Sequence, residues 1–272
     1  MASMSLQPST LSSLGLFMKS NVRMKPIPPP KDLSLRGQTA LITGGNSGLG
    51  FEAAKQLLQH GLSRLVITSR SAEKGKKAAD SLRASCQNPD SEILVWELDM
   101  LSYDSIQQFV RRCESELLPL GNSVSGRGLD IAILNAGVAQ AVFAINRSTG
   151  HEETFQTNYL STALLAILLL PLLKGKGKPK VGSKPGRLSI VGSSTGLTAA
   201  FGNRNANPLI PSFDDQHHWE EMGAFERYSV SKTLVMVLLA QLGKQELVDE
   251  DGNGVQVNAF EPGFVRGTNC KK

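Results

Sequence analysis

The chain has 272 residues, enough for one large domain or two small ones, and its 40% hydrophobic and 19% charged residues exclude a wholly disordered protein. The net charge is +5, from 29 lysines and arginines against 24 acids. Six of the cations lie within residues 174–187, a run with Gly and Pro but no aromatic residue to stack a base, so we interpret it as a solvated loop and expect no nucleic-acid partner.

The first 35 residues are predicted to form an extended N-terminal arm, because they carry Ser, Pro and Lys, including the run Ile27-Pro28-Pro29-Pro30. A weak apolar patch at Leu14–Met18 has no basic residue before it and lacks the long apolar centre of a signal peptide. We therefore expect a cytoplasmic protein whose cofactor-binding domain spans residues 36–272.

Predicted strands and helices alternate from residue 38 onward. The predicted strands are 39–43, 64–68, 93–97, 130–134, 188–191 and 255–259. The predicted helices are 48–60, 72–84, 102–118 (with Ser102 as N-cap), 152–173 and 225–247. This alternation predicts an α/β fold of three layers, with a doubly wound parallel sheet of the Rossmann type. Ligands of such sheets bind beyond the carboxyl ends of the strands.

The most apolar stretch, Ala163–Leu173, is shorter than the roughly 18 residues of a membrane span, and Pro171 interrupts it. We expect no integral membrane segment. The three cysteines, Cys86, Cys113 and Cys270, have no paired spacing, which argues against a disulfide framework and a zinc site.

A glycine-rich sequence, TGGNSGLG at 43–50, follows the first predicted strand and opens the first helix. Glycine there allows a sharp turn, a close backbone approach to a pyrophosphate and tight packing of helix on sheet. The helix N-terminus then offers free N–H groups to the phosphates. The expected cofactor contacts in this loop are Gly44, Asn46, Ser47, Gly48, Leu49 and Gly50.

The second strand ends at Thr68-Ser69-Arg70, where an NAD site would place an acid for the ribose 2′-hydroxyl. Ser69 stands in that position, and Arg70 can form a forked contact with a 2′-phosphate, so NADP is favoured over NAD. Asp99 after the third strand suits a hydrogen bond to the adenine amino group, with a role at the start of the next helix as the alternative. Asn135-Ala136-Gly137 ends the fourth strand. Its small residues would let the cofactor lie against the backbone, so Asn135 is an expected cofactor contact.

Tyr228 and Lys232 form a YxxxK pair at the start of the helix predicted after the fifth strand. Positions i and i+4 share one helical face, so the phenol and the ammonium point the same way. A cation about 4 Å away contributes ~4 kcal/mol at an intermediate dielectric. That equals roughly three pKa units and would bring the phenol near neutrality. The pair predicts acid/base chemistry at Tyr228.

Together, TGGNSGLG, LNAG, YSVSK and Glu261-Pro262-Gly263 stand in an order that resembles the short-chain dehydrogenase/reductase superfamily over residues 38–268. The segment 152–173 resembles the central helix of its retinol-dehydrogenase-like and fungal reductase members. The resemblance implies that Tyr228 moves the proton, Lys232 lowers its pKa and holds the nicotinamide ribose, and Asn158 supports a water relay. It also implies that Ser193, with Ser194 as the alternative, steadies the substrate oxygen, and that Val265 covers the nicotinamide.

Three departures from the family pattern stand out. Ser193 and Tyr228 lie thirty-five residues apart, and the segment between them contains prolines and a His217-His218 pair, which we interpret as a substrate-side loop and not as a metal site. The family pattern would place a threonine at position 267, but this chain has Gly267 there and its threonine, Thr268, is one position later. The chain ends nine residues after Gly263, so we expect the family's last strand to be missing and the sixth strand to be an exposed edge.

The sequence thus predicts an NADP(H)-dependent oxidoreductase that acts on a carbonyl or alcohol carbon of a small lipophilic molecule. The alternative is a catalytically impaired, shortened NADP-binding pseudoenzyme. The relatives implied by the resemblance often pair through the helices at 152–173 and 225–247, so a homodimer is a further expectation.

Overall fold

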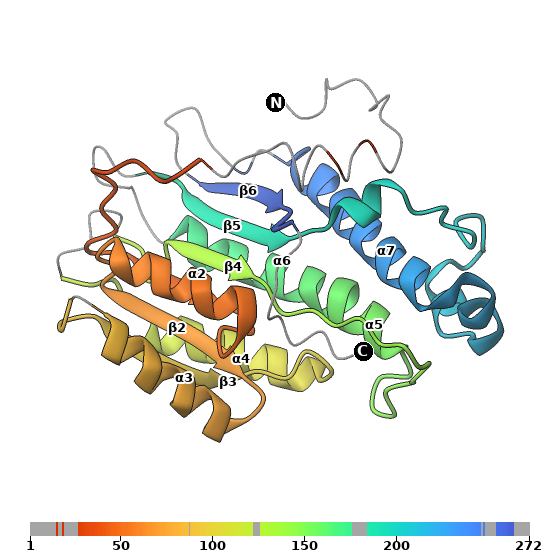
Figure 1. Cartoon of the computed structure of the whole chain (residues 1–272), viewed down its shortest axis with the longest axis horizontal. Coiled ribbons are helices and arrows are strands. Elements are labelled where there is room, and N and C mark those ends of the chain that lie inside the picture. Colours follow the sequence, from red (N-terminus) through yellow and green to blue (C-terminus); the bar gives the residue numbers. More distant parts are fainter. Residues whose placement is uncertain are drawn as a thin grey trace.

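In the computed structural model the described residues are 27–86, 88–121, 126–175, 184–245, 247 and 254–263, together with 15 and 18. Within them, six strands form one parallel sheet in the order β3-β2-β1-β4-β5-β6 (Figure 1). The strands are β1 (Thr39–Ile42), β2 (Arg64–Ser69), β3 (Glu92–Glu97), β4 (Ile131–Leu134), β5 (Gly186–Val191) and β6 (Val255–Phe260). The order reverses between β1 and β4, which confirms the predicted doubly wound Rossmann sheet. Among the described residues β6 pairs with β5 alone, as expected of an edge strand.

Helices connect these strands. They are α2 (Gly48–Gln59), α3 (Ala72–Ser85), α4 (Tyr103–Glu116), α5 (Glu153–Phe155), the π-helical turn η3 (Gln156–Leu160), α6 (Ser161–Lys174), the 3₁₀ turns η4 (Ser194–Leu197) and η5 (Ile210–Phe213), and α7 (Gln216–Leu242). Ser102 caps α4 as predicted, because its side chain accepts a hydrogen bond from the Ser105 backbone N–H.

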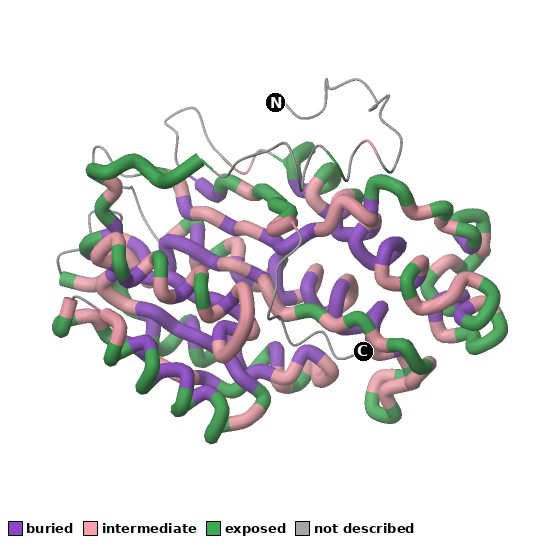
Figure 2. The backbone as a smooth tube through the Cα atoms, in the orientation of Figure 1, coloured by how far each residue is buried: buried purple, intermediate pink, exposed green. Residues whose placement is uncertain are grey.

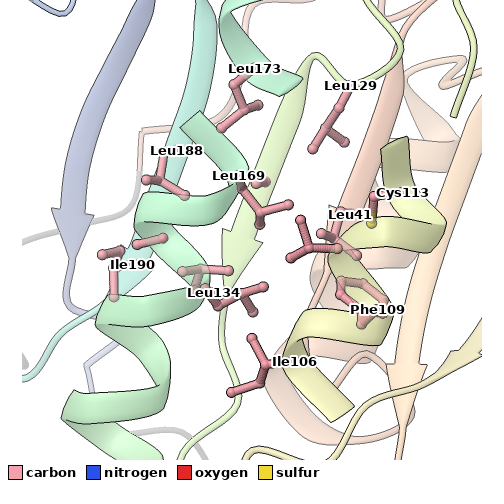
Figure 3. Packing of buried hydrophobic residues seen from close by; sticks show 14 of the residues in the cluster. Leu41, Ile106, Phe109, Cys113, Leu129, Leu134, Leu169, Leu173, Leu188 and Ile190 are labelled. Carbon is pink, nitrogen blue, oxygen red and sulfur yellow. The ribbon is translucent and has the colours of Figure 1, made fainter. Parts of the chain in front are cut away.

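Two hydrophobic cores cover the two faces of the sheet, as the alternating side chains of β1 require. Ala40 and Ile42 point to the face covered by α2 and α3, whereas Leu41 points to the face covered by α4, α6 and α7. Figure 3 shows the second core, in which Leu169 of α6 and Phe109 of α4 lie over Leu41 and Leu134. The strands near the middle of the sheet are therefore buried along most of their length (Figure 2).

The central helix differs from its prediction as a single helix. It is divided into α5, the π turn η3 and α6. By length and composition Glu153–Lys174 could cross a membrane, although half of that stretch is buried inside the fold. Leu165 and Leu169 are fully buried against the sheet, so this is the core helix of the domain. The expectation that no apolar stretch is long enough to span a membrane was therefore wrong as to length.

The segment between Ser193 and Tyr228 also differs from its prediction. Asp215 accepts a hydrogen bond from the His217 backbone N–H and starts α7 at Gln216, well before the predicted start. His217 and His218 therefore lie on a helix and not on a loop. Gly223, with φ 70° and ψ 160°, interrupts α7, and the helical segment after it begins close to the predicted residue 225.

Part of the predicted arm contacts the domain. Leu35 is buried, and its N–H donates to the His60 carbonyl at 2.9 Å. Leu33 packs against the core beneath α2. Residues 27–32 are exposed. Most of the arm lies outside the described residues, so its extended conformation stays a prediction.

Candidate active site

The glycine loop at 43–47 leaves the carboxyl end of β1 and enters α2. Gly44 has φ +64°, a conformation that L side chains rarely adopt. A Cβ on Gly50 would lie 2.6 Å from both the Asn135 side-chain nitrogen and the Gly44 carbonyl oxygen. Glycine is therefore needed at the first of these positions for the turn and at the second for the close approach of α2 to the sheet.

The N-terminus of α2 has the chemistry of an anion site. Its N-cap, Ser47, is extended and makes no capping hydrogen bond, and the first turn contains no acid. The first N–H groups of the helix therefore lack intrahelical acceptors and can bind phosphate. Asn46 lies in the loop beside Ser47, and Gly48 and Leu49 form the first turn.

Thr43 connects the glycine loop to the end of β4, a role that sequence reasoning missed. Its Oγ1 accepts hydrogen bonds from the backbone N–H groups of Asn135 (2.9 Å) and Ala136 (3.0 Å). The Asn135 side chain returns a bond to the Thr43 carbonyl at 3.0 Å. Asn135 thus contacts the loop itself. Thr43 is the first residue of the TGGNSGLG motif, which is the signal that could have revealed it.

The end of β2 presents a hydroxyl and a guanidinium. Ser69 is buried; its Oγ donates to the Ser71 carbonyl at 2.9 Å and accepts from the Ser71 N–H at 3.2 Å. Arg70, the next residue, is exposed. This edge of the sheet therefore carries a positive charge where an NAD site would place a carboxylate.

Asp99, after β3, takes part in the turn that leads into α4. Its Oδ1 accepts from the Leu101 N–H at 3.0 Å, and its own N–H donates to Ser105 Oγ at 3.0 Å. The helix-start role weighed from the sequence is therefore present. The contact to adenine stays a prediction.

Tyr228 and Lys232 share one face of α7, at the carboxyl end of β5. Lys232 is 5% exposed, and its Nζ donates to the Val191 carbonyl at 2.9 Å. The same Nζ lies 5.6 Å from the centroid of the Tyr228 ring. The structure thus places the ammonium beside the phenol ring and binds it to the end of β5.

Asn158 lies in the π turn and faces Lys232. Its Nδ2 donates to the Val138 carbonyl (2.8 Å) and to Ser231 Oγ (3.0 Å), and its Oδ1 accepts from the Val138 N–H (2.9 Å). A Cβ on Gly137 would lie 3.2 Å from Asn158 Oδ1 and 3.6 Å from Lys232 Nζ. Asn158 and Lys232 therefore converge at Gly137, the last residue of the LNAG motif.

Ser193 follows β5 and caps η4. Its Oγ accepts from the Thr195 N–H (3.3 Å) and from Thr195 Oγ1 (3.0 Å). A Cβ on Gly196 would lie only 2.9 Å from the Lys232 backbone carbon, so η4 packs directly against the helix that carries the pair. Ser194 is the first residue of η4, and both serines are half-buried. The choice between them stays a prediction.

Val265, a predicted nicotinamide contact, lies outside the described residues, as do Gly267 and Thr268. Just before them, Gly263 follows the carboxyl end of β6 with φ 71°. The two histidines at the start of α7 each lie beside an exposed carboxylate: His217 is 3.3 Å from Glu221, and His218 is 3.1 Å from Asp215. In the described part of the chain, no three His, Cys, Asp or Glu side chains gather as metal ligands.

Comparison with known proteins identifies the family of the chain. Residues 38–204 match the family model of the short chain dehydrogenases. Short chain dehydrogenase/reductase mfmJ of Annulohypoxylon moriforme is 46% identical over 268 residues, which cover 98% of this chain and 72% of that protein. Short chain dehydrogenase virL of Hypocrea virens is 40% identical over 257 residues, covering 94% and 68%. The chain belongs to the short-chain dehydrogenase/reductase family, a family of oxidoreductases.

Solved structures share the fold. The Pseudomonas aeruginosa RhlG/NADP active-site complex superposes with a TM-score of 0.56 at 28% identity, over 84% of this chain and 72% of that chain. A short chain dehydrogenase from Salmonella enterica superposes with a TM-score of 0.58 at 21% identity, over 87% and 79%. The second likeness concerns the fold alone.

Proposed function

We propose that the chain is an NADP(H)-dependent oxidoreductase that transfers a hydride between the nicotinamide and a carbonyl or alcohol carbon of a small lipophilic substrate. The observation that carries the proposal is the convergence of Tyr228, Lys232 and Asn158 at the carboxyl ends of β4 and β5. In a doubly wound sheet this edge also carries the glycine loop, so proton-transfer groups and a dinucleotide site lie along one rim.

Tyr228 is the proposed general acid/base, which exchanges a proton with the substrate oxygen. Lys232 stabilises the tyrosinate and so lowers the pKa of the phenol, because a nearby cation favours the charged form. Its ammonium is also the proposed ligand of the nicotinamide ribose. Ser193 donates a hydrogen bond to the substrate oxygen, and Asn158 orders the polar groups around Lys232 as part of a proton relay.

The residues at the rim fit a phosphorylated dinucleotide. When bound, the cofactor supplies or accepts the hydride. The open N-terminus of α2 binds its pyrophosphate. Because Gly50 has no Cβ, the glycine loop lies close to the sheet. Arg70 binds the 2′-phosphate, Asp99 the adenine amino group, and Val265 the nicotinamide. The NADP complex of the 28% identical RhlG supports this choice of cofactor.

Exposed apolar side chains on α7 and on the two 3₁₀ turns that pack against it, η4 and η5, support a lipophilic substrate. Leu197 of η4 is 59% exposed, Ile210 of η5 is 46% exposed and Phe225 of α7 is 70% exposed. Leu197 follows the Ser193 turn, and Phe225 precedes Tyr228 by three residues. The pseudoenzyme alternative has no support from the described residues, in which the Tyr228, Lys232 and Asn158 arrangement is intact.

Replacement of Tyr228 by Phe tests the proposal. The Tyr228→Phe variant should lose turnover by about 100-fold or more, since it removes the proton donor, while it keeps its affinity for NADPH. Cofactor oxidation with a panel of cyclic and aromatic ketones measures turnover, and NADPH fluorescence measures binding. Tyr103→Phe, which removes a phenol at the start of α4, is the matched control and should behave as the wild type. Full activity of Tyr228→Phe would end the proposal.

A further inference from the structure

The two residues directly before Tyr228 are bound by a segment that is distant from them in sequence. We call residues 198–215, between η4 and α7, the insert. Glu226 Oε1 accepts a hydrogen bond from the Phe201 N–H at 2.9 Å, near the start of the insert. Arg227 Nη2 donates to the Phe213 carbonyl near its end, and the guanidinium lies 5.3 Å from the centroid of the Phe213 ring. Both ends of the insert thus contact consecutive residues of α7.

The insert has a packed interior of its own. Phe213 is 2% exposed and stacks on Phe155 of α5, with ring centroids 4.1 Å apart and planes 7° apart. The ring centroid of Phe201 lies 6.2 Å from that of Phe213. Asn203 and Ser212, both buried, are joined by a hydrogen bond of 2.7 Å. The contacts to α7 therefore come from an ordered unit and not from a free loop.

Asp214 connects the insert to α5. Its Oδ1 accepts from the Glu152 N–H at 2.9 Å, and its Oδ2 lies 2.9 Å from His151 Nδ1. Glu152 is fully buried, and burial raises the pKa of its carboxyl while the Arg227 charge opposes that rise. Arg227 is thus bound between the insert and α5, where these elements meet beside α7 (Figure 1).

The backbone of α7 gives Tyr228 little support from upstream. Gly223 is non-helical, with φ 70° and ψ 160°, so the ladder of α-helical hydrogen bonds is interrupted five residues before Tyr228. The first turn after such a break has no intrahelical acceptors for its N–H groups. Lys232, by contrast, is bound to the Val191 carbonyl. Glu226 and Arg227 therefore supply contacts to the Tyr228 turn from outside the helix.

Strain at the start of the insert points the same way. Phe201 has φ 52°, in the left-handed region that bulky side chains rarely adopt. Such a residue persists only where its surroundings over-determine it, and strained residues of this kind cluster at functional sites. The Phe201 N–H is the group that Glu226 binds, so the strain lies in the connection to α7.

We propose that Glu226 and Arg227 are positioning residues, through which the insert sets the orientation of the Tyr228 phenol relative to the Lys232 ammonium. This inference rests on the proposed function, because it takes Tyr228 as the acid/base. It gives the insert a part in proton transfer in addition to its place beside the substrate.

A spectroscopic titration tests the inference without a known substrate. The chain contains three tyrosines. Burial raises the pKa of Tyr103, to which the Asp214 charge adds, and burial raises that of Tyr159. Tyrosinate absorbance that develops below the ordinary pKa of about 10 in the wild type, and is missing in Tyr228→Phe, therefore belongs to Tyr228.

Glu226→Met removes the acceptor for Phe201, whereas Glu226→Gln keeps an oxygen in the same place. In Glu226→Met we expect the pKa of Tyr228 to rise by about one unit and kcat to fall about 10- to 100-fold, with NADPH affinity unchanged. Glu226→Gln should restore both values. Glu220→Met is the matched control, since the Glu220 side chain is exposed and accepts a hydrogen bond from Gln216, at 2.8 Å.

Arg227→Lys is the second variant, because it keeps the charge beside Glu152 and loses the guanidinium fork over Phe213. Thermal melts identify any variant that does not fold. A Tyr228 titration equal to that of the wild type in both folded variants overturns the positioning role and leaves the proposed function standing. A wild type in which no tyrosine titrates early contradicts the acid/base role itself, and the inference falls with it.

Discussion

Ser69 is the residue on which we expect the choice of cofactor to depend. It ends β2, and its buried hydroxyl contacts Ser71 at the start of α3. A carboxylate in this place would bind a ribose 2′-hydroxyl and repel a 2′-phosphate. We predict that Ser69→Asp weakens NADPH binding about tenfold or more and strengthens NADH binding, since ~1.4 kcal/mol of repulsion corresponds to that factor. Fluorescence titration with both cofactors measures the change.

Ser81→Asp is the control for this prediction. Ser81 is exposed on α3 and donates to the Lys77 carbonyl, so the variant adds the same charge away from the end of β2. It should keep the cofactor preference of the wild type. An unchanged preference in Ser69→Asp would show that another residue selects the cofactor.

At the scale of elements, the contact between η4 and α7 joins the Ser193 turn to the Tyr228 helix. Because a Cβ on Gly196 would lie 2.9 Å from the Lys232 backbone carbon, a side chain there must push the two elements apart. We predict that Gly196→Ala lowers stability by about 1–3 kcal/mol and reduces kcat, as strained overpacking does. Gly121→Ala, where a Cβ meets no atom of the described residues within 4 Å, is the control. Thermal unfolding and ketone turnover measure both effects, and a Gly196→Ala protein as active and stable as the control would refute the packing role.

At the scale of the whole molecule, α6 packs against β4, β5 and β6 on one face of the sheet. Leu169 is fully buried in the cluster that includes side chains of β4, β5 and α4. Leu169→Ala should lower the free energy of unfolding by about 2–5 kcal/mol, the usual cost of a core cavity. Leu118→Ala makes the same substitution at a residue that is 63% exposed and should cost little. Urea denaturation compares the two, and an equal loss would show that α6 is not part of the core.

The alternation of short β-rich runs with helical segments was sufficient to predict the sheet, because β1 and β2 are buried and apolar and α3 and α4 repeat a buried face. The strand predicted at 64–68 is observed at Arg64–Ser69, and the helix predicted at 72–84 at Ala72–Ser85. Gly44, Tyr228 and Lys232 lie at strand ends, as a parallel sheet requires. Their roles toward cofactor and substrate stay predictions.

Features that depend on contacts between distant segments could not be predicted in this way. Arg227 carries no sequence signal, since its partner Phe213 lies fourteen residues upstream and its charge faces Glu152. The helix over 216–222 was missed because the prolines before it suggested a loop. The π turn was missed because Gln156–Leu160 contains no Gly or Pro that would interrupt the predicted helix.

The π turn determines the direction in which the Asn158 side chain leaves the helix, toward Lys232. A π turn contains one residue more than an α-helical turn, and each residue of a helix turns the chain by about 100°. Deletion of one residue within Gln156–Leu160 would therefore let a regular helix run from α5 into α6, with the Leu169 face still on the sheet. The amide of Asn158 would then rotate away from Val138, so a single extra residue separates a helix that only packs on the sheet from one that also binds the backbone of Val138.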